Sequence, residues 1–434
     1  MENRPSWSSQ FAFIISTIGS AIGLGNIWRF PYIMGENGGA IFLIIYLVLI
    51  LFICAIPLLA ELVLGKISQK NTLGAYCSIN PKFEIFGWLN VCCTIMISSF
   101  YFVVGGWVIY YILKSFALNQ ITDFGQYFTN FVSGTYTPIL FTILFLSICI
   151  FFIYRGVNQG IETANKIMMP ALGVLLVVLV AVSLNLPNAY LGLKFMFSPD
   201  FSKIDFSMML AALGQALFTL SIGMGTILTY GSYLKKEDNI AKSAYTIIVA
   251  DTIFAILAGV MIFPAVFSFG LQPDSGASLV FITLPKIFSQ MQYGGLVALG
   301  FFFLLFFAAL TSGISIVEVP VAVLIEKFNI SRKKAAAIMF AIIGLISIPV
   351  TLSFSVLSDF KILGKTLFDL FDCTTANILM PVSSMIVCLV VGWGLNLAND
   401  YVFKSKILHN IFIFMMKYIL PILFIILIIT GLIG

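Results

Sequence analysis

The sequence contains little charge. Only 9% of its 434 residues are Asp, Glu, Lys or Arg, whereas 60% are hydrophobic and the mean hydropathy is +1.08. A soluble domain needs more charged residues on its surface, so this composition is typical of a polytopic membrane protein. The net charge of +5 comes from lysines between apolar segments, without a basic patch interleaved with aromatic residues. The composition therefore argues against nucleic-acid binding.

Residues for metal binding and nucleophilic catalysis are also scarce. The single histidine, His409, lies between apolar segments, and the seven cysteines have no metal-ligand spacing. We interpret the cysteines as small buried hydrophobic residues. No GxSxG or HExxH motif occurs, and no histidine falls in a predicted span. We therefore expect no enzyme. The first apolar segment lacks a basic n-region, so we also expect no cleavable signal peptide.

Eleven apolar segments are long enough to cross a membrane at about 20 residues per helix. They lie at residues 10–35, 40–66, 85–118, 137–154, 164–184, 206–233, 242–269, 291–326, 334–355, 365–394 and 410–433. With a cytoplasmic N-terminus, most of the 23 Lys and Arg fall in inner loops, while Arg29 and Lys417 lie within segments. We predict an all-α inner-membrane protein with one domain over residues 1–434, and an outer C-terminus.

The first apolar segment contains the stretch GSAIGLGNIWRFP at residues 19–31. Each of its glycines weakens a helix by up to about 1 kcal/mol relative to Ala. Asn26 and Arg29 place an amide and a charge at membrane depth, where non-helical backbone is tolerated only inside protein or along a cavity. A helix-packing face of small residues is the alternative, but it does not account for Asn26 and Arg29. We predict a broken helix at a binding site.

The sixth apolar segment is interrupted in the same way by FTLSIGMGTILTY at residues 218–230. Two interrupted helices at corresponding positions of two five-helix halves are typical of a 5+5 inverted-repeat secondary transporter, with its site near the midplane. We predict repeat one at about 10–184, repeat two at about 206–394 and an extra helix at about 410–433. Two glycine-rich helices that pack independently are the alternative.

These two stretches resemble the neurotransmitter:sodium symporter family, in its bacterial amino-acid branch with the leucine-transporter fold. FFAALTSGISIVEVP in the eighth segment and FDLFDCTTANILMP in the tenth agree, and the resemblance covers nearly the whole chain apart from a missing twelfth helix. It implies Na⁺-coupled amino-acid uptake by alternating access. The expected partners are an amino-acid substrate and the lipid bilayer, with no obligate protein partner evident. A sensor that binds without translocation is the alternative function, and charged gates argue against a channel.

The resemblance implies two Na⁺ sites with oxygen ligands, which hard cations prefer. The first site would use Ala21, Asn26, Thr219 and Asp251. The second would use Gly19, Ile22, Ala308, Thr311 and Ser312. For the Thr311–Ser312 pair, hydrogen bonds to carbonyls of the same helix are the alternative.

Asp251 is a carboxylate within a predicted span, which is costly and by default functional. The family often has Asn at this position, and its animal members bind Cl⁻ close by. We therefore expect Asp251 to supply the negative charge that Cl⁻ supplies elsewhere, so that Cl⁻ is not required. Tyr46 and Gln215 are what remains of the expected chloride shell. The alternative is that Asp251 caps the cytoplasmic start of the seventh helix.

The N-termini of broken helices present N–H groups to a carboxylate. At the position of Gly23, monoamine transporters of the family carry Asp, so Gly23 favours an α-amino acid. The implied pocket is apolar with hydroxyls and no charge, which favours Tyr, Trp, Phe or Leu. Its residues are Ala21, Gly23, Leu24, Gly25, Ile97, Tyr101, Phe218, Thr219, Ser221, Met224, Ser312 and Ile316. For the aliphatic members, simple core packing is the alternative.

The resemblance also implies two gates. Outside, Arg29 would pair with Asp372, with Tyr101 and Phe218 as a lid. Inside, the vestibule would be closed by Arg4, Trp7, Ser232, Tyr233 and Glu326. Residues 160–170, read as GIETANKIMMP, suggest a fifth helix whose start unwinds. We interpret Glu61 and Glu318 as members of helix–helix networks and not as ligands.

Overall fold

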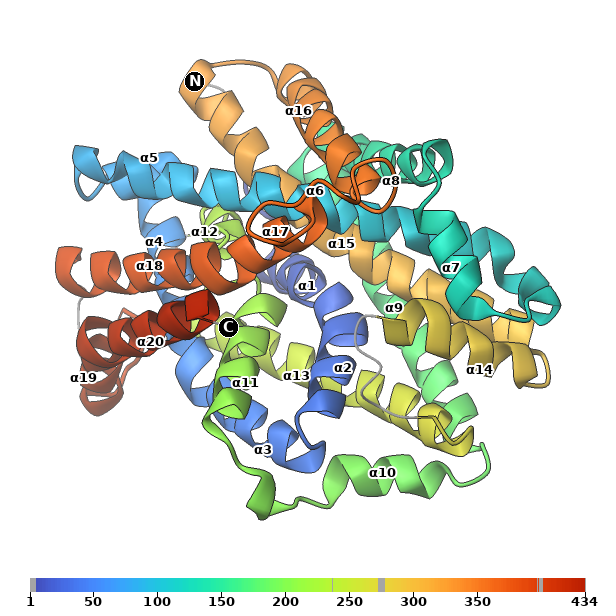
Figure 1. Cartoon of the computed structure of the whole chain (residues 1–434). Helices are drawn as coiled ribbons and strands as arrows, with labels where there is room; N and C mark the ends of the chain where they lie inside the picture. Colours follow the sequence, from blue (N-terminus) through green and yellow to red (C-terminus); the bar gives the residue numbers. More distant parts are fainter. Residues whose placement is uncertain (1–4, 236, 272–277, 396, 398–400, 434) are drawn as a thin grey trace.

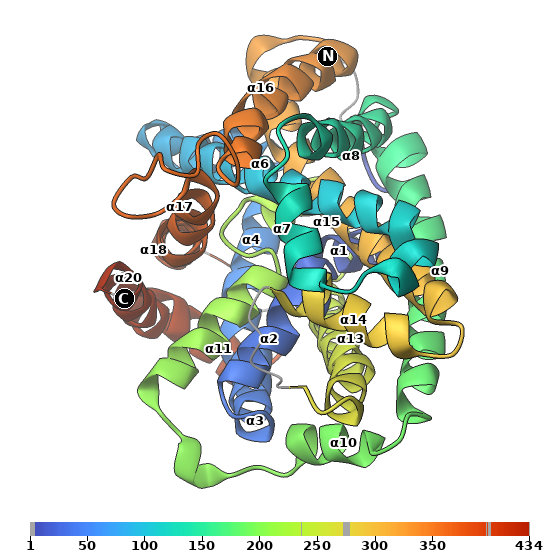
Figure 2. The same ribbon diagram turned by 45° about the vertical axis from the view of Figure 1, so that its right-hand side comes forward.

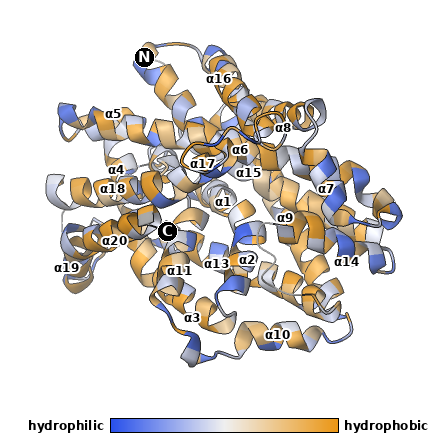
Figure 3. Cartoon of the chain, in the orientation of Figure 1, coloured by the Kyte–Doolittle hydropathy of each residue, from blue (hydrophilic) through white to orange (hydrophobic). Residues whose placement is uncertain are grey.

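The computed structural model describes residues 5–235, 237–271, 278–395, 397 and 401–433. Over these residues the secondary structure is helical, apart from an isolated β-bridge between Ile362 and Lys365. Figure 3 shows that apolar residues dominate the long helices, while hydrophilic residues gather in loops and at helix ends. The all-α class predicted from the sequence is confirmed.

Nine continuous helices of the described residues are long and apolar enough to cross a membrane. Their large apolar side chains include exposed ones such as Phe52, Val174 and Leu345, as expected of a surface that faces lipid. These helices agree with nine predicted spans to within four residues at each end, except that the fifth begins at Val157, seven residues before its predicted start. They are α3–η2–α4 (Ala40–Ser68), η3–α6–η4 (Pro81–Gln120), α8 (Tyr136–Tyr154), η5–α9 (Val157–Leu184), α13 (Ile240–Ser268), α15 (Gly294–Phe328), α16 (Arg332–Leu352), α17–η8–α18 (Leu367–Gly394) and α19–η9–α20 (Lys406–Leu432).

Short polar side chains begin several of these helices, because they bind backbone N–H groups that the first turn leaves free. Ser9 accepts a hydrogen bond from Ala12 N at 3.1 Å, and Asn239 accepts one from Lys242 N at 2.9 Å. The last helix begins at Lys406, so His409 lies inside it and is buried, contrary to its predicted place in a loop. Shorter helices connect the spans, namely α5 (Thr72–Cys77), α7 (Phe124–Val132), α10 (Ala189–Phe197) and α14 (Leu284–Gln290).

The first predicted span is a broken helix. α1 (Gln10–Ala21) is followed by η1 (Gly25–Arg29) and α2 (Phe30–Glu36), and the two parts are bent by 46°. The break lies at residues 22–24, where Ile22 has extended backbone. In Figures 1 and 2, α1 lies at the centre of the bundle, surrounded by the longer helices. The break predicted from the glycines is therefore present, and it is deep inside the protein.

The sixth predicted span is broken as well. α11 (Phe206–Thr219) and α12 (Thr226–Gly231) are separated by six residues that include Ser221, Gly223 and Gly225, all with positive φ. A Cβ at Gly223 would lie 2.3 Å from the Met380 carbonyl oxygen, so glycine is needed there for both conformation and space. α11 alone has 14 residues and is too short to count as a span. The described helices thus give nine spans, or ten with the bent pair, and the count of eleven stays a prediction.

Candidate functional site

A small cavity lies where the two breaks face α6 (Glu84–Lys114) and α15. It is lined by Ser20, Ala21, Gly23, Leu24, Gly25, Ile97, Tyr101, Phe218, Ser221, Met224, Ser312 and Ile316. Ser20 is the one lining residue that the sequence does not predict, and Thr219 is the one predicted substrate residue that does not line it. The structure therefore brings residues from four separate segments to one place.

The cavity is contracted. The free space between the lining side chains is about 20 Å³, which is room for about one water molecule and not for an amino acid. Phe218 covers the first break, since a Cβ at Gly25 would lie 3.1 Å from Phe218 Cδ1. Met224 is buried against the same space. Entry of an amino acid therefore requires the walls of the cavity to separate.

The polar atoms of the cavity come mainly from the breaks. Tyr101 Oη accepts a hydrogen bond from Leu24 N at 3.5 Å, and Ser221 Oγ donates one to the Ser20 carbonyl at 3.1 Å. Apolar side chains of α6 and α15, together with Met224, supply most of the remaining wall. One side of the cavity thus offers backbone and hydroxyl groups, and the other offers aliphatic surface.

A buried carboxylate lies behind the first break. Asp251 accepts hydrogen bonds from Asn26 Nδ2 at 2.8 Å and from Thr219 Oγ1 at 3.1 Å. Asp251 is the twelfth residue of α13, and Asn239 caps that helix, so the alternative in which Asp251 is the cap is wrong. No Lys or Arg among the described residues forms an ion pair with Asp251.

The surroundings of Asp251 fit a cation. A buried charge with hydrogen bonds alone costs several kcal/mol unless an opposite charge compensates it. Asn26 Oδ1 accepts only from Gly23 N, at 3.0 Å, and so keeps a lone pair for a ligand. Tyr46 Oη and Gln215 Oε1 are buried without hydrogen-bond partners in the described part of the chain. Amide, hydroxyl and carboxylate oxygens together form a donor set that suits Na⁺.

A second group of oxygens lies at the C-terminal end of α1. Ser312 Oγ is 3.0 Å from the Ser20 carbonyl oxygen, and 3.3 Å from the carbonyl oxygens of Gly19 and Ile22. Thr311 Oγ1 instead donates hydrogen bonds to the carbonyls of Phe307 and Ala308 in its own helix. Hydrogen bonding within the helix, the alternative for the Thr311–Ser312 pair, therefore holds for Thr311 and not for Ser312. Free carbonyls at a helix C-terminus carry partial negative charge. This group also fits a cation.

Known proteins match this chain over its whole length. The profile of the sodium:neurotransmitter symporter family matches residues 4–126 and 129–434. The chain belongs to this family. It is 40% identical over 398 residues to the uncharacterized sodium-dependent transporter YhdH of Bacillus subtilis, covering 90% of this chain and 88% of that one. It is 34% identical to an uncharacterized sodium-dependent transporter of Haemophilus influenzae, covering 99% of each.

A solved structure is similar to the whole symporter. The crystal structure of MhsT in complex with L-phenylalanine superposes with a TM-score of 0.91 at 40% identity, covering 99% of this chain and 100% of that one. The rat sodium- and chloride-dependent GABA transporter 2 is more distant, at 27% identity over 430 residues, which cover 86% of this chain and 70% of the relative. The predicted family is thus confirmed, and the protein is a sodium-dependent symporter.

On the predicted outer side of the symporter, Arg29 contacts an aromatic ring. Its guanidinium carbon lies 4.7 Å from the centre of the Phe218 ring, and its Nη1 is buried without a hydrogen-bond partner among the described residues. Asp372 interacts with Arg29 only at longer range. The predicted direct pairing of Arg29 with Asp372 is therefore wrong for this conformation, because the ring face attracts the cation and holds it over the cavity.

On the predicted inner side, the N-terminal segment covers α12. Trp7 is buried, and it donates from Nε1 to the Tyr230 carbonyl at 3.0 Å and from its backbone N to the Tyr233 carbonyl at 3.2 Å. Ser232 Oγ bonds to the Thr229 carbonyl. Arg4 lies outside the described residues. Trp7, Ser232 and Tyr233 are thus close together, as the predicted inner gate requires.

Carboxylates also join the helix ends on this predicted inner side. Glu326 accepts from the backbone N and from Nδ2 of Asn71, at 2.9 and 2.8 Å. Glu318 binds both Arg332 amino groups, at 2.7 and 2.8 Å, and also accepts from Tyr233 Oη at 2.8 Å. The sequence does not predict the Glu318–Arg332 pair, because no spacing signal links the end of one helix to the start of the next.

Two other carboxylates join separate segments: Glu61, on α4 (Ala55–Ser68), holds the break of the sixth predicted span, and Glu162 binds the N-terminal segment. Glu61 of α4 accepts from the backbone N–H groups of Gly223 and Leu228, at 2.7 and 3.2 Å. Glu162, at the end of η5, binds Ser8 and Lys166. The spacing of Glu162 and Lys166 by four residues could have indicated their pair. The contact with Ser8 has no signal in the sequence.

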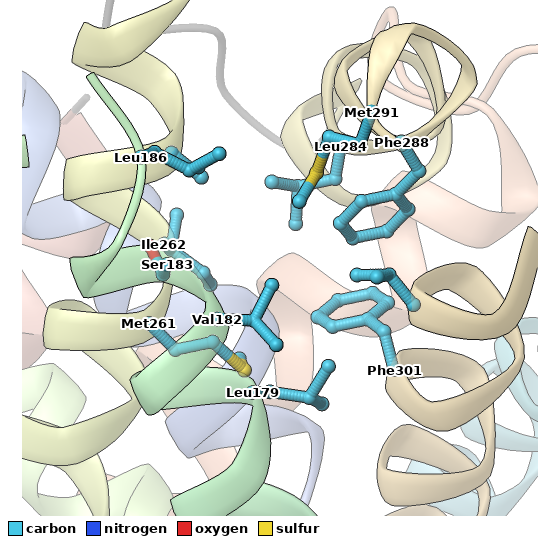
Figure 4. A pocket seen from close by; sticks show the side chains of 12 residues that line it. Leu179, Val182, Ser183, Leu186, Met261, Ile262, Leu284, Phe288, Met291 and Phe301 are labelled. Atoms are coloured by element: carbon cyan, nitrogen blue, oxygen red, sulfur yellow. The ribbon is translucent and has the colours of Figure 1, made fainter. Parts of the chain in front are cut away.

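A second cavity lies between α9, α13, α14 and α15 (Figure 4). Its walls are aliphatic and aromatic except for Ser183, and its free space is also about 20 Å³. Figure 4 shows Phe288 and Phe301 on one side and Leu179, Val182 and Leu186 on the other. No titratable side chain lines it, so this cavity offers no chemistry for an ion or an amino acid.

Proposed function

We propose that this symporter imports a hydrophobic or aromatic L-amino acid, of the Tyr, Trp, Phe and Leu class, by Na⁺-coupled alternating access. The observation that carries the proposal is a cavity without charged side chains beside a buried, unpaired Asp251. An uncharged wall suits an apolar side chain, and the carboxylate suits a cation. The binding of L-phenylalanine by MhsT, which is 40% identical, supports the same substrate class.

The two ends of a zwitterion would meet different groups. The substrate carboxylate would face Leu24 N, Gly25 N and Tyr101 Oη, in the space that the missing side chain of Gly23 leaves. The substrate amine would face the carbonyls of the two breaks, from Ala21, Phe218 and Thr219, together with the Ser221 hydroxyl. Backbone groups at broken helices supply such partners without added side chains. Ile97, Met224 and Ile316 would contact the substrate side chain.

Two Na⁺ ions would occupy the oxygen groups already described. Asn26, Thr219, Asp251 and the Ala21 carbonyl would hold one, and Ser312, Thr311 and the carbonyls of Gly19, Ile22 and Ala308 would hold the other. The carboxylate of Asp251 would offset part of the cation charge in a low-dielectric interior. Cl⁻ would then not be needed for transport. Each ion that crosses the membrane contributes about 2.3 kcal/mol per 100 mV.

The proposed topology has eleven spans, with α11 and α12 together forming the sixth, and a cytoplasmic N-terminus. The first ten spans would form two inverted repeats of five, and the last would follow them. Access from outside would open when Arg29 and Phe218 leave the first break. Access from inside would open when Trp7 leaves α12 and the N-terminal segment parts from Glu162. These contacts would close the cavity from opposite sides, as alternating access requires.

Uptake into proteoliposomes tests this function. Purified protein is reconstituted with an inward Na⁺ gradient, and uptake of labelled Phe, Tyr, Trp, Leu, Ala and Glu is compared with uptake under choline. We expect Na⁺-dependent accumulation of the first four, with little uptake of Glu. Na⁺-dependent binding without accumulation would support the sensor instead. Equal uptake in Na⁺ and choline, or a preference for Glu, would contradict the proposal.

A further inference from the structure

Lys417 is a charged residue in the last apolar helix, away from the cavity, the oxygen groups and the gates described above. It is the central residue of η9 (Met415–Ile419), a single π-helical turn between α19 (Lys406–Phe414) and α20 (Leu420–Ile433). Such turns interrupt α-helices at a cost and are frequent at functional sites. Lys417 forms no ion pair with any described carboxylate. A lysine in this position needs a partner that the described residues do not supply.

The lysine side chain lies against the neighbouring helix and reaches an aromatic ring on it. Its Nζ lies 4.5 Å from the centre of the Trp393 ring on α18 (Met380–Gly394). A Cβ at Gly392 would lie 3.1 Å from Lys417 Cγ, so the absence of a side chain there leaves room for the lysine stem. A cation over an indole gains about 0.5–1 kcal/mol at an exposed site, which positions the ammonium but leaves its charge unbalanced.

The aromatic residues around Lys417 face away from the protein. Trp393 is 60% exposed, Tyr418 is 47% exposed and Phe414 is 54% exposed. Tyr418 packs edge-on against Trp393, and Phe414 packs against Tyr418. In Figures 1 and 2, α20 lies at the edge of the bundle, where lipid surrounds a membrane protein. The cation and the aromatic rings therefore form one patch on the lipid-facing surface.

This patch lies beside the end of α18. Trp393 is the residue before the end of α18, and a Cβ at the next residue, Gly394, would lie 2.8 Å from Ile79 in the loop that follows α5. Exposed Trp and Tyr are typical of the membrane–water interface, and lysine stems extend toward it. We infer that the Lys417 ammonium, beside Trp393 at the end of α18, can extend toward the depth of the lipid phosphates.

We propose that Lys417, Trp393 and Tyr418 form a binding site for the phosphate of an anionic phospholipid. The ammonium and the Tyr418 hydroxyl would bind phosphate oxygens, and the exposed rings would contact the upper part of the acyl chains. A zwitterionic lipid carries its own ammonium beside the phosphate and competes with Lys417. One lysine at an anionic surface contributes about fivefold in affinity.

Native mass spectrometry of the intact protein tests this site. The probes are phosphatidylglycerol and phosphatidylcholine with the same acyl chains, added to the detergent-purified chain. The wild type should retain phosphatidylglycerol about fivefold more than phosphatidylcholine. Lys417→Gln should abolish the difference, and Lys417→Arg should keep it. Lys406→Gln, which removes an exposed lysine at the start of the same helix, is the matched control and should behave as the wild type.

Each remaining outcome overturns the site. Equal retention of the two lipids by the wild type would show that the protein does not distinguish an anionic headgroup from a zwitterionic one. Unchanged preference in Lys417→Gln, or equal losses in Lys417→Gln and Lys406→Gln, would assign the effect to general surface charge. A wild-type dimer that Lys417→Gln dissociates without any change in lipid retention would show that the patch binds a second copy. Because the measurement needs no transport, it stands apart from the proposed substrate and coupling.

Discussion

Replacing Gly23 by Ala is the sharpest test of the cavity. A Cβ at this position would lie 2.4 Å from Ser312 Oγ and 3.1 Å from Tyr101 Oη. Both hydroxyls must then move, and overpacking of a filled interior costs about 1–3 kcal/mol. The cost falls mainly on the substrate-bound state, because the substrate carboxylate is proposed to lie in this same space, whereas in the empty protein the ends of the Ser312 and Tyr101 side chains can turn away from the added methyl group. Gly23→Ala should therefore weaken substrate binding roughly 5- to 150-fold.

Equilibrium binding of labelled phenylalanine and leucine to purified protein in NaCl measures this change. Gly214→Ala is the matched control, because a Cβ at Gly214, on the other broken span, would meet no atom within 4 Å. Its affinity should equal that of the wild type. Gly23→Asp should bind more weakly than Gly23→Ala, since it adds a fixed carboxylate where the substrate carboxylate is proposed to lie.

The reasoning would be refuted by wild-type affinity in Gly23→Ala. Thermal unfolding of each variant without substrate separates a local effect from a folding defect, because a defect confined to the substrate-bound state leaves the melting temperature of the empty protein nearly unchanged. A large fall in that temperature together with lost binding would place the strain in the empty protein and not at the substrate.

Three further predictions concern the neighbouring residues. Asp251→Asn should abolish Na⁺-driven uptake or make it Cl⁻-dependent, while wild-type uptake proceeds in gluconate; an Asn variant with normal Cl⁻-free uptake would contradict the proposed charge. Met224→Phe should shift a competition profile from aromatic toward smaller aliphatic amino acids, and an unchanged profile would remove Met224 from the pocket. Glu61→Gln replaces one of two carboxylate oxygens that accept buried N–H groups, which should lower stability by about 1–3 kcal/mol in a melting experiment, whereas an unchanged melting temperature would show that the two bonds contribute little.

The two breaks could be predicted from the sequence because their causes are local. Glycine and polar residues at membrane depth weaken a helix wherever they occur, and the structure places breaks at residues 22–24 and 220–225. The position of Asp251 was open between a ligand and a cap. It is decided by Asn239, which occupies the cap of α13 about three helical turns before Asp251 and so leaves the carboxylate in the helix interior.

Other parts of the site depend on contacts that spacing along the chain does not reveal. Arg29 lies over Phe218 and not beside Asp372, because the position of a ring from a different span decides which partner is nearer. Glu162 binds Ser8 across 154 positions of sequence. The contraction of the cavity results from how Phe218 and Met224 pack. Periodicity and motifs predict which helices meet. They do not predict the size of the cavity that remains between the side chains of those helices.

The bond from Glu61 to the sixth span limits how the protein can move. Gly65 and Gly231 let α4 and α12 touch backbone to backbone, since a Cβ at Gly65 would lie 2.2 Å from the Leu228 carbonyl oxygen. This contact and the two hydrogen bonds that Glu61 accepts attach α12 firmly to α4. The second half of the sixth predicted span therefore cannot move independently of α4. α4 must move together with α12. A small tilt of this helix pair at one face of the membrane therefore produces a larger displacement of its opposite end.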